Sequence, residues 1–155
     1  MTPLELQDEL IKELQEIFKD YAYKTPLGKR ISPNIYAQHI PISETDDDAD
    51  PVPYIIVRLN TGDDEGIRDS FNKVGLVIIV CIYDDALEAQ GHRDVLNIIQ
   101  KIYERFHKNP NLHNKAAYTG EFHWAAQEED YYPFYFGACS MNFNIAAIRR
   151  EDEYA

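Results

Sequence analysis

Three aspartates at alternate positions have the side chains and the spacing of residues that bind a metal ion. Asp46, Asp48 and Asp50 match the opening of a calcium-binding EF-hand loop, in which alternating carboxylates supply oxygen ligands. Such a loop also requires a glycine at its sixth position and a glutamate at its twelfth, and Pro51 and Val57 stand there instead. The pattern favours a solvated acidic loop over an EF-hand, with looser cation binding as the alternative.

The remaining metal and phosphate patterns are also incomplete. The histidines form no HxH or HxxxH pair and the sequence has no CxxC motif; they are His39, His92, His107, His113 and His123. Gly62 and Gly66 suggest a phosphate-binding loop, but Asp63, Asp64 and Glu65 between them would repel a phosphate group. We therefore expect neither a metal ion nor a cofactor.

Two arrangements resemble nucleophilic or acid–base sites. Cys139 and His123 could pair across neighbouring strands, but both are expected in the middle of a sheet, where packing is the simpler role. Glu128 and Glu129 are adjacent at the end of a strand, so their side chains should point to opposite faces rather than toward one substrate. The sequence therefore argues against an enzyme.

The charge balance is strongly acidic. With 27 acidic and 15 basic residues among 155, the formal net charge is −12. Nonspecific nucleic-acid binding needs Lys and Arg to displace the counterions of phosphates, so this field disfavours it. The charge suits a basic partner, or a surface that must not adhere to DNA, and it also serves solubility.

The cysteines and the N-terminal segment indicate the cellular compartment in which we expect the protein. Cys81 and Cys139 each lie inside an apolar run, which favours buried free thiols, with a disulfide between neighbouring strands as the alternative. The segment MTPLELQDELIKEL has no basic start and no continuous apolar core, unlike a signal peptide. No stretch approaches the roughly eighteen apolar residues of a membrane span. We expect a cytosolic protein without membrane contact.

We expect one domain over residues 1–155, beginning with a helix over 1–22. Thr2 is a candidate N-cap, Pro3 stands at the first helical position and Glu5 completes a capping box. An apolar stripe then recurs at intervals of three and four residues; it comprises Leu6, Leu10, Leu14, Ile17 and Tyr21. Residues 23–53 form a long irregular acidic segment, of which 35–42 is expected to be extended and to pair at a sheet edge.

Residues 54–148 are expected to hold the sheet and a second helix, followed by a charged tail at 149–155. Residues 54–60 alternate and 74–84 are apolar on both faces, which predicts an antiparallel hairpin with an extended tip. A helix is predicted over 87–107 by a buried stripe of Val95, Ile98, Ile99, Ile102 and Phe106. Residues 121–127 and 135–145 alternate as strands, and in the first of them Phe122, Trp124 and Ala126 share one side. The fold class is therefore α+β, with a mostly antiparallel four- to five-stranded sheet and two main helices packed on one face.

The central strand, 74–83, has apolar side chains toward its second face as well. Two helices can cover only one face of such a sheet. We therefore expect the second face to be covered by the 23–53 segment, by another subunit, or by both, and we favour oligomerisation.

The chain contains, in order, an N-terminal amphipathic helix, PYIIVRLN, an acidic loop, VGLVIIVCIYD, GHRDVLNIIQKIYERF and YYPFYFGACSMNFNIAAIRRED. This succession resembles that of the tail terminator, or tail completion, proteins of long-tailed bacteriophages and prophages. These are themselves similar to minor head–tail joining proteins. The resemblance extends over most of the chain from Pro53 onward and rests on element order and strand texture, most of all on the last strand ending in IRRED.

The resemblance implies a non-enzymatic structural protein that forms a hexameric ring. Such a ring caps the tail tube and joins it to the head, so its partners would be the tail tube protein and the head–tail connector proteins. It would be found in the cytoplasm of the bacterial host during assembly, and then at the head-proximal end of the virion tail. The alternatives are a head–tail connector or neck protein of similar fold, or a small cytosolic ligand-binding or enzymatic α+β domain.

No functional residues come with the resemblance, and the candidate surfaces are inferred from charge. DNA must pass a tail lumen without adhering, and acids lining a ring would repel it. The loops 44–50 and 61–69 are therefore candidates for the lumen or for a partner surface, through Asp46, Asp47, Asp48, Asp50, Asp63, Asp64 and Glu65. Arg149 and Arg150, after the last strand, are candidates for pairing with acids of an adjacent subunit.

Overall fold

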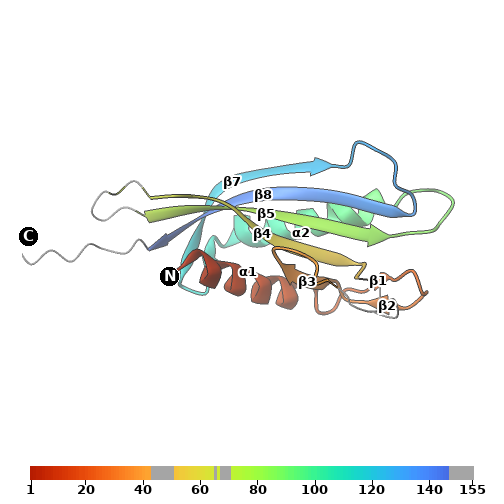
Figure 1. Ribbon diagram of the computed structural model, residues 1–155, viewed down its shortest axis with the longest axis horizontal. Coiled ribbons are helices and arrows are strands. Elements are labelled where there is room, and N and C mark those ends of the chain that lie inside the picture. Colours follow the sequence, from red (N-terminus) through yellow and green to blue (C-terminus); the bar gives the residue numbers. More distant parts are fainter. Residues whose placement is uncertain (43–50, 65, 67–70, 147–155) are drawn as a thin grey trace, which may run out of the picture.

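The computed structural model describes residues 1–42, 51–64, 66 and 71–146. Along the chain its elements are α1 (Pro3–Phe18), β1 (Tyr23–Lys24), β2 (Arg30–Ile31), β3 (Asn34–Ala37), β4 (Tyr54–Asp63), β5 (Phe71–Tyr83), α2 (His92–Lys108), β6 (Asn111–Leu112), β7 (Ala116–Ala126) and β8 (Phe134–Ala146) (Figure 1). The α+β class is confirmed.

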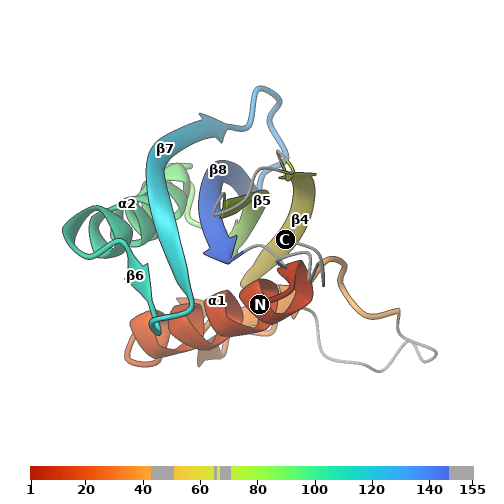
Figure 2. The same ribbon diagram turned by 90° about the vertical axis from the view of Figure 1, so that its left-hand side faces the viewer.

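Six strands form one sheet in the order β3-β4-β5-β8-β7-β6, and β1 and β2 form a separate two-stranded sheet. The main sheet thus has more strands than the four or five expected. Every pairing in it is antiparallel except that of β3 with β4. The predicted β4–β5 hairpin is confirmed, and β8 lies in the middle of the sheet between β5 and β7. Figure 2 shows the sheet end-on, curling from β7 through β8 and β5 to β4.

The start of α1 follows its sequence signals. Oγ1 of Thr2 accepts a hydrogen bond from the backbone N–H of Glu5 at 3.2 Å, and Pro3 occupies the first turn. The helix ends at Phe18 rather than near residue 22, because the chain must turn for Tyr23 to pair with Ile31 in the small sheet. Tyr21 therefore lies outside the buried stripe and is exposed.

Short strands stand where residues 23–53 were expected to be irregular. The β1–β2 hairpin turns at Gly28, whose φ of +86° is a conformation that glycine adopts without steric cost. β3 overlaps the predicted edge segment and pairs in parallel with the start of β4, with Asn34 opposite Tyr54. These strands have two to four residues, which is too short for a periodic pattern to reveal.

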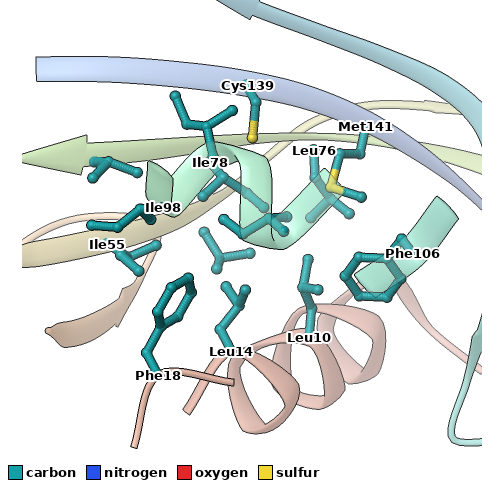
Figure 3. Close-up of a cluster of buried hydrophobic side chains, with 14 of the residues drawn as sticks. Leu10, Leu14, Phe18, Ile55, Leu76, Ile78, Ile98, Phe106, Cys139 and Met141 are labelled. Carbon is teal, nitrogen blue, oxygen red and sulfur yellow. The ribbon is translucent and has the colours of Figure 1, made fainter. Parts of the chain in front are cut away.

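Both helices pack on one face of the sheet, as predicted. Alternate residues of β5 and β8 point into the core between sheet and helices, while the residues between them point to the second face. Figure 3 shows this core, in which Leu10, Leu14 and Phe18 of α1 meet residues of the sheet and of α2. On β8 the buried set is the one that alternation predicts: Tyr135, Gly137, Cys139, Met141, Phe143 and Ile145.

The second helix begins later than predicted, at His92 rather than near residue 87. The carboxylate of Asp84 accepts a hydrogen bond from the N–H of Ala86 at 2.9 Å, which starts a turn, and Ala89 has a φ of 54°. Leu87 is almost fully exposed in this loop. The predicted buried stripe of α2 is confirmed in full: Val95, Ile98, Ile99, Ile102 and Phe106.

The strand predicted at residues 121–127 is longer in the structure. β7 begins at Ala116, earlier than expected, and its register against β8 shifts between Tyr118 and Phe122. Trp124 stands opposite Cys139, but its side chain is 60% exposed. Because β6 pairs only with the first residues of β7, the later part of β7 lacks a neighbour on its outer side and remains open to solvent.

Candidate interaction surface

The two cysteines and His123 do not form a nucleophilic site. In the β7–β8 ladder Trp124 stands opposite Cys139 and His123 opposite Ser140, so Cys139 and His123 point to opposite faces. Cys81 and Cys139 are both buried and neither is part of a disulfide, which confirms the thiol prediction and makes the disulfide alternative wrong. Burial raises the pKa of Cys139 to about 12, so its reactive thiolate form is suppressed.

His113 joins α1 to the connection between α2 and β7. Its Nδ1 lies 2.5 Å from Oε2 of Glu9, and its Nε2 lies 2.9 Å from Oε2 of Glu13. Lys115 also reaches Glu9, and the guanidinium of Arg105 reaches Glu13. These five residues are called the His113 cluster below. Its two carboxylates bind opposite nitrogens of one ring, so they do not converge on a common point where a cation could sit.

The electrostatics of the His113 cluster follow from these contacts. Hydrogen bonds to Glu9 and then to Glu13 raise the pKa of His113. The bonds from His113 and Lys115 lower the pKa of Glu9 to about 2. Burial opposes ionisation of Glu13, but its bonds with Arg105 and His113 outweigh that effect and its pKa lies below the ordinary value. The imidazolium form of His113 therefore acts as a bridge between two turns of α1.

The described residues contain no group of three His, Cys, Asp or Glu side chains placed to hold a metal ion. The other histidines considered in the sequence lie apart from one another. His107 stacks on Tyr103 with ring centroids 4.9 Å apart, and His39, His92 and His123 are exposed.

Two of the predicted surface acids can be placed. Asp63 ends β4 opposite Lys73 of β5, and the carboxylate of Asp64 accepts a hydrogen bond from the N–H of Gly66 at 2.9 Å. Both are exposed near the tip of the β4–β5 hairpin, at the end of the molecule opposite the β7–β8 loop (Figure 1). The other candidates lie outside the described residues: Asp46, Asp47, Asp48, Asp50, Glu65, Arg149 and Arg150.

The second face of the sheet carries apolar side chains that the two helices leave uncovered. Its centre consists of Ile56 of β4, Val77 and Ile79 of β5, and Phe136 and Ala138 of β8, which are brought together by the strand register. All but Ile56 are half-buried, and Ile56 is buried. Both helices of the described part lie on the opposite face. The second apolar face expected along residues 74–83 is therefore present, and residues of β4 and β8 extend it.

The two ends of this face differ in character. Toward the β4–β5 tip it is polar, where Glu121 accepts hydrogen bonds from Lys73 at 3.0 Å and from Asn142 at 2.6 Å. Toward the other end it is aromatic, with the rings of Tyr83 and Phe134 packed edge to face at 5.6 Å. Tyr83 and Phe134 are partners in the β5–β8 ladder, so no spacing along the sequence could indicate that their rings meet.

Neither helix of the described residues has the length and apolar character to cross a membrane.

Comparison with known proteins supplies no further assignment. No family model matches the chain. No curated protein matches it either. The candidate surface therefore rests on the strand register and the burial of its residues.

Proposed function

We propose that this protein is a structural component of a bacteriophage tail. It would be a terminator whose copies form a hexameric ring that caps the tail tube and joins it to the head, without enzymatic activity. The proposal begins from the resemblance of its element order and strand texture to tail terminator proteins. What supports it in three dimensions is the apolar second face of the sheet.

The second face is the observation that carries the proposal. Val77, Ile79 and Phe136 present apolar side chains on a rigid sheet, and a contiguous apolar surface rimmed by polar groups is typical of protein–protein contacts. A neighbouring copy that covered this face would remove its apolar surface from water, which stabilises the contact by roughly 25 cal/mol for each Å² buried. A ring gives every copy the same contact and leaves no face open.

The acidic residues predicted from the sequence are also part of this proposal. Asp63 and Asp64 lie at a hairpin tip that projects beyond the helices, and acids on such a tip would repel DNA in a lumen. Asp46, Asp47, Asp48, Asp50 and Glu65 are proposed for the same role from sequence alone. Arg149 and Arg150 are proposed to pair with acids of an adjacent subunit.

Solution mass tests the contact between copies. We expect the wild-type protein to have the mass of a hexamer, and Ile79→Asp to be a folded species of lower mass, because a carboxylate on the second face cannot be buried without a partner. Leu4→Asp is the matched control, since Leu4 is 65% exposed on α1 and the charge change is the same. Its mass should remain that of wild type.

Tail-tube capping tests the function itself. Purified tube protein is polymerised with and without this protein, and tube lengths are measured by negative-stain electron microscopy. A terminator shortens the tubes and is found at one end, with Ile79→Asp inactive. Unchanged tube lengths together with binding to purified portal would instead assign the protein to the neck. Unchanged lengths with no binding to either would refute a role in the tail.

A further inference from the structure

Two loops meet at the end of the molecule where β5 ends and β8 begins: residues 84–91 and residues 127–133 (Figure 1). The N–H of Asp84 donates to the carbonyl of Pro133 at 2.9 Å, and the hydroxyl of Tyr132 donates to the carbonyl of Asp85 at 2.6 Å. The side chain of Asp85 pairs with Lys24 of β1 at 2.7 Å. The loops therefore hold each other in a fixed arrangement.

Aromatic side chains continue from the second face onto these loops. The ring of Tyr131 packs edge to face on Phe136 at 5.8 Å, and next to it lies the pair of Tyr83 and Phe134. Tyr131 is nevertheless 52% exposed and Tyr132 is 42% exposed. Exposed tyrosines with one face on protein and one in water are typical of interface residues, because each adds contact area at a small cost in side-chain entropy.

The same two loops are rich in carboxylates. The two loops contain six acidic residues and neither Lys nor Arg: Asp84, Asp85, Glu88, Glu128, Glu129 and Asp130. The hydroxyl of Tyr131 donates to the carboxylate of Glu129 at 2.7 Å, so acid and ring are placed as one unit. We call the six acids together with Tyr131 and Tyr132 the acidic–aromatic end.

The internal hydrogen bonds of the 127–133 loop keep the tyrosines in this position. Gln127 binds the backbone of β8 through both its N–H and its side-chain oxygen, and its amide nitrogen donates to the carbonyl of Glu129 at 2.8 Å. The carboxylate of Asp130 accepts from the N–H of Tyr132 at 2.9 Å. A surface already ordered in this way loses little conformational entropy when it binds a partner.

We propose that the acidic–aromatic end binds an arginine-bearing segment of another protein. A guanidinium group can stack flat on an exposed tyrosine ring while it donates two parallel hydrogen bonds to a carboxylate, and this end offers both within one loop. A lysine ammonium reproduces only the charge. Nucleic acid is excluded by the same carboxylates, which repel phosphates. The occupant is assigned to another protein, because the six acids attract a partner of opposite charge, whereas this chain has a net charge of −12. This inference is independent of the proposed ring.

A peptide probe tests the proposal. A blocked peptide with four arginines separated by glycines is titrated into the full protein at about 0.15 M salt, which screens long-range attraction. The analogues with lysine and with uncharged citrulline are the chemical controls. We expect saturable binding of the arginine peptide, weaker binding of the lysine peptide and none of the citrulline peptide. Equal affinity for arginine and lysine, or no saturable binding at all, overturns the proposal.

Variants locate the binding. Tyr131→Leu keeps an apolar side chain but removes the ring, and Glu88→Gln combined with Glu128→Gln removes two charges. Each should weaken binding by about fivefold to tenfold, the scale of a cation–π contact or of a charge-assisted bond. Asp8→Asn combined with Asp20→Asn removes the same charge from exposed positions near α1 and should leave affinity within about twofold.

Three results would contradict the assignment. Equal losses in the local and the remote charge variants would show diffuse attraction to an acidic protein. Self-association that Tyr131→Leu abolishes would assign the surface to a second copy. Binding of a single-stranded oligonucleotide that depends on Tyr131 would assign it to nucleic acid. Circular dichroism of each variant shows whether it is folded, so a loss of binding is interpreted only for folded protein.

Discussion

Gly91 lies directly against the ring of Tyr135, where a Cβ on Gly91 would stand 2.3 Å from Cδ2 of the tyrosine. Gly91 immediately precedes α2 and Tyr135 is the second residue of β8, so this contact fixes the start of the helix on the central strand. The absence of a side chain at Gly91 is thus a packing requirement, and its φ of −62° needs no glycine.

Gly91→Ala should therefore destabilise the protein by about 1–3 kcal/mol, the usual cost of overpacking, as measured by urea unfolding. Gly62→Ala is the control, because a Cβ at Gly62 has open space around it. Replacing Tyr135 with leucine in the Gly91→Ala background should recover part of the loss. If Gly91→Ala is as stable as Gly62→Ala, the ring of Tyr135 does not limit the space at Gly91.

The buried stripe of α1 gives a second prediction. Leu10 is fully buried against the sheet, so Leu10→Ala leaves a cavity and should cost about 2–5 kcal/mol of the free energy of unfolding. Leu4→Ala on the same helix alters an exposed side chain and should change the free energy of unfolding by about 0.5 kcal/mol or less. Comparable losses in the two variants would show that α1 is not packed as described.

The His113 cluster predicts a pH-dependent contribution to stability. Because the pKa of His113 is raised in the folded state, its contribution is complete below the ordinary value of 6.5 and is lost as the pH rises through the raised value. The lowered pKa values of Glu9 and Glu13 contribute above their ordinary value of 4.5, and that contribution is lost as the pH falls. The cluster is therefore strongest between about pH 5 and 6.5.

Urea midpoints of the wild type and of His113→Gln measure this effect. The difference between them should be largest near pH 6 and should shrink toward pH 9, while Lys115 and Arg105 keep their bonds to the carboxylates. His39→Gln, at an exposed histidine, should follow the wild type across the range. A difference between wild type and His113→Gln that grows with pH would mean that the neutral imidazole, and not the imidazolium, stabilises the fold.

Thiol labelling tests the burial of Cys81 and Cys139. Cys81 is 1% exposed and Cys139 is 2% exposed, and the raised pKa of Cys139 suppresses its thiolate. A disulfide-exchange reagent should label neither thiol of the native protein within minutes and both in denaturant. Rapid labelling of one thiol in native protein would mean that the sheet opens there.

Local sequence signals correctly predicted the features that depend only on residues close together in the chain. The cap at Thr2, the stripe of α1 and the alternation along β8 depend on residues a few positions apart. They hold in the structure, except that the stripe does not extend to Tyr21. The start of α2 was misplaced because Leu87 fits a helical pattern while the turn at Asp84 and the contact at Gly91 set the boundary. The exposure of Trp124 follows from the short extent of β6, which no local pattern contains.

The candidate surface was only partly predictable, for the same reason. Alternation along residues 74–83 indicated a second apolar face, and the register between β5 and β8 showed which residues compose it. The His113 cluster joins residues about a hundred positions apart, so spacing rules could not find it. The acidic–aromatic end likewise depends on two loops that only the folded sheet brings together.

The central position of β8 has a consequence for synthesis. Its neighbours β5 and β7 are both made earlier, yet neither can complete its pairing until β8 has left the ribosome. Until then β5 and β7 each present an unpaired strand edge, which is a template for pairing with another chain. The sheet is therefore complete only when β8 has inserted between β5 and β7.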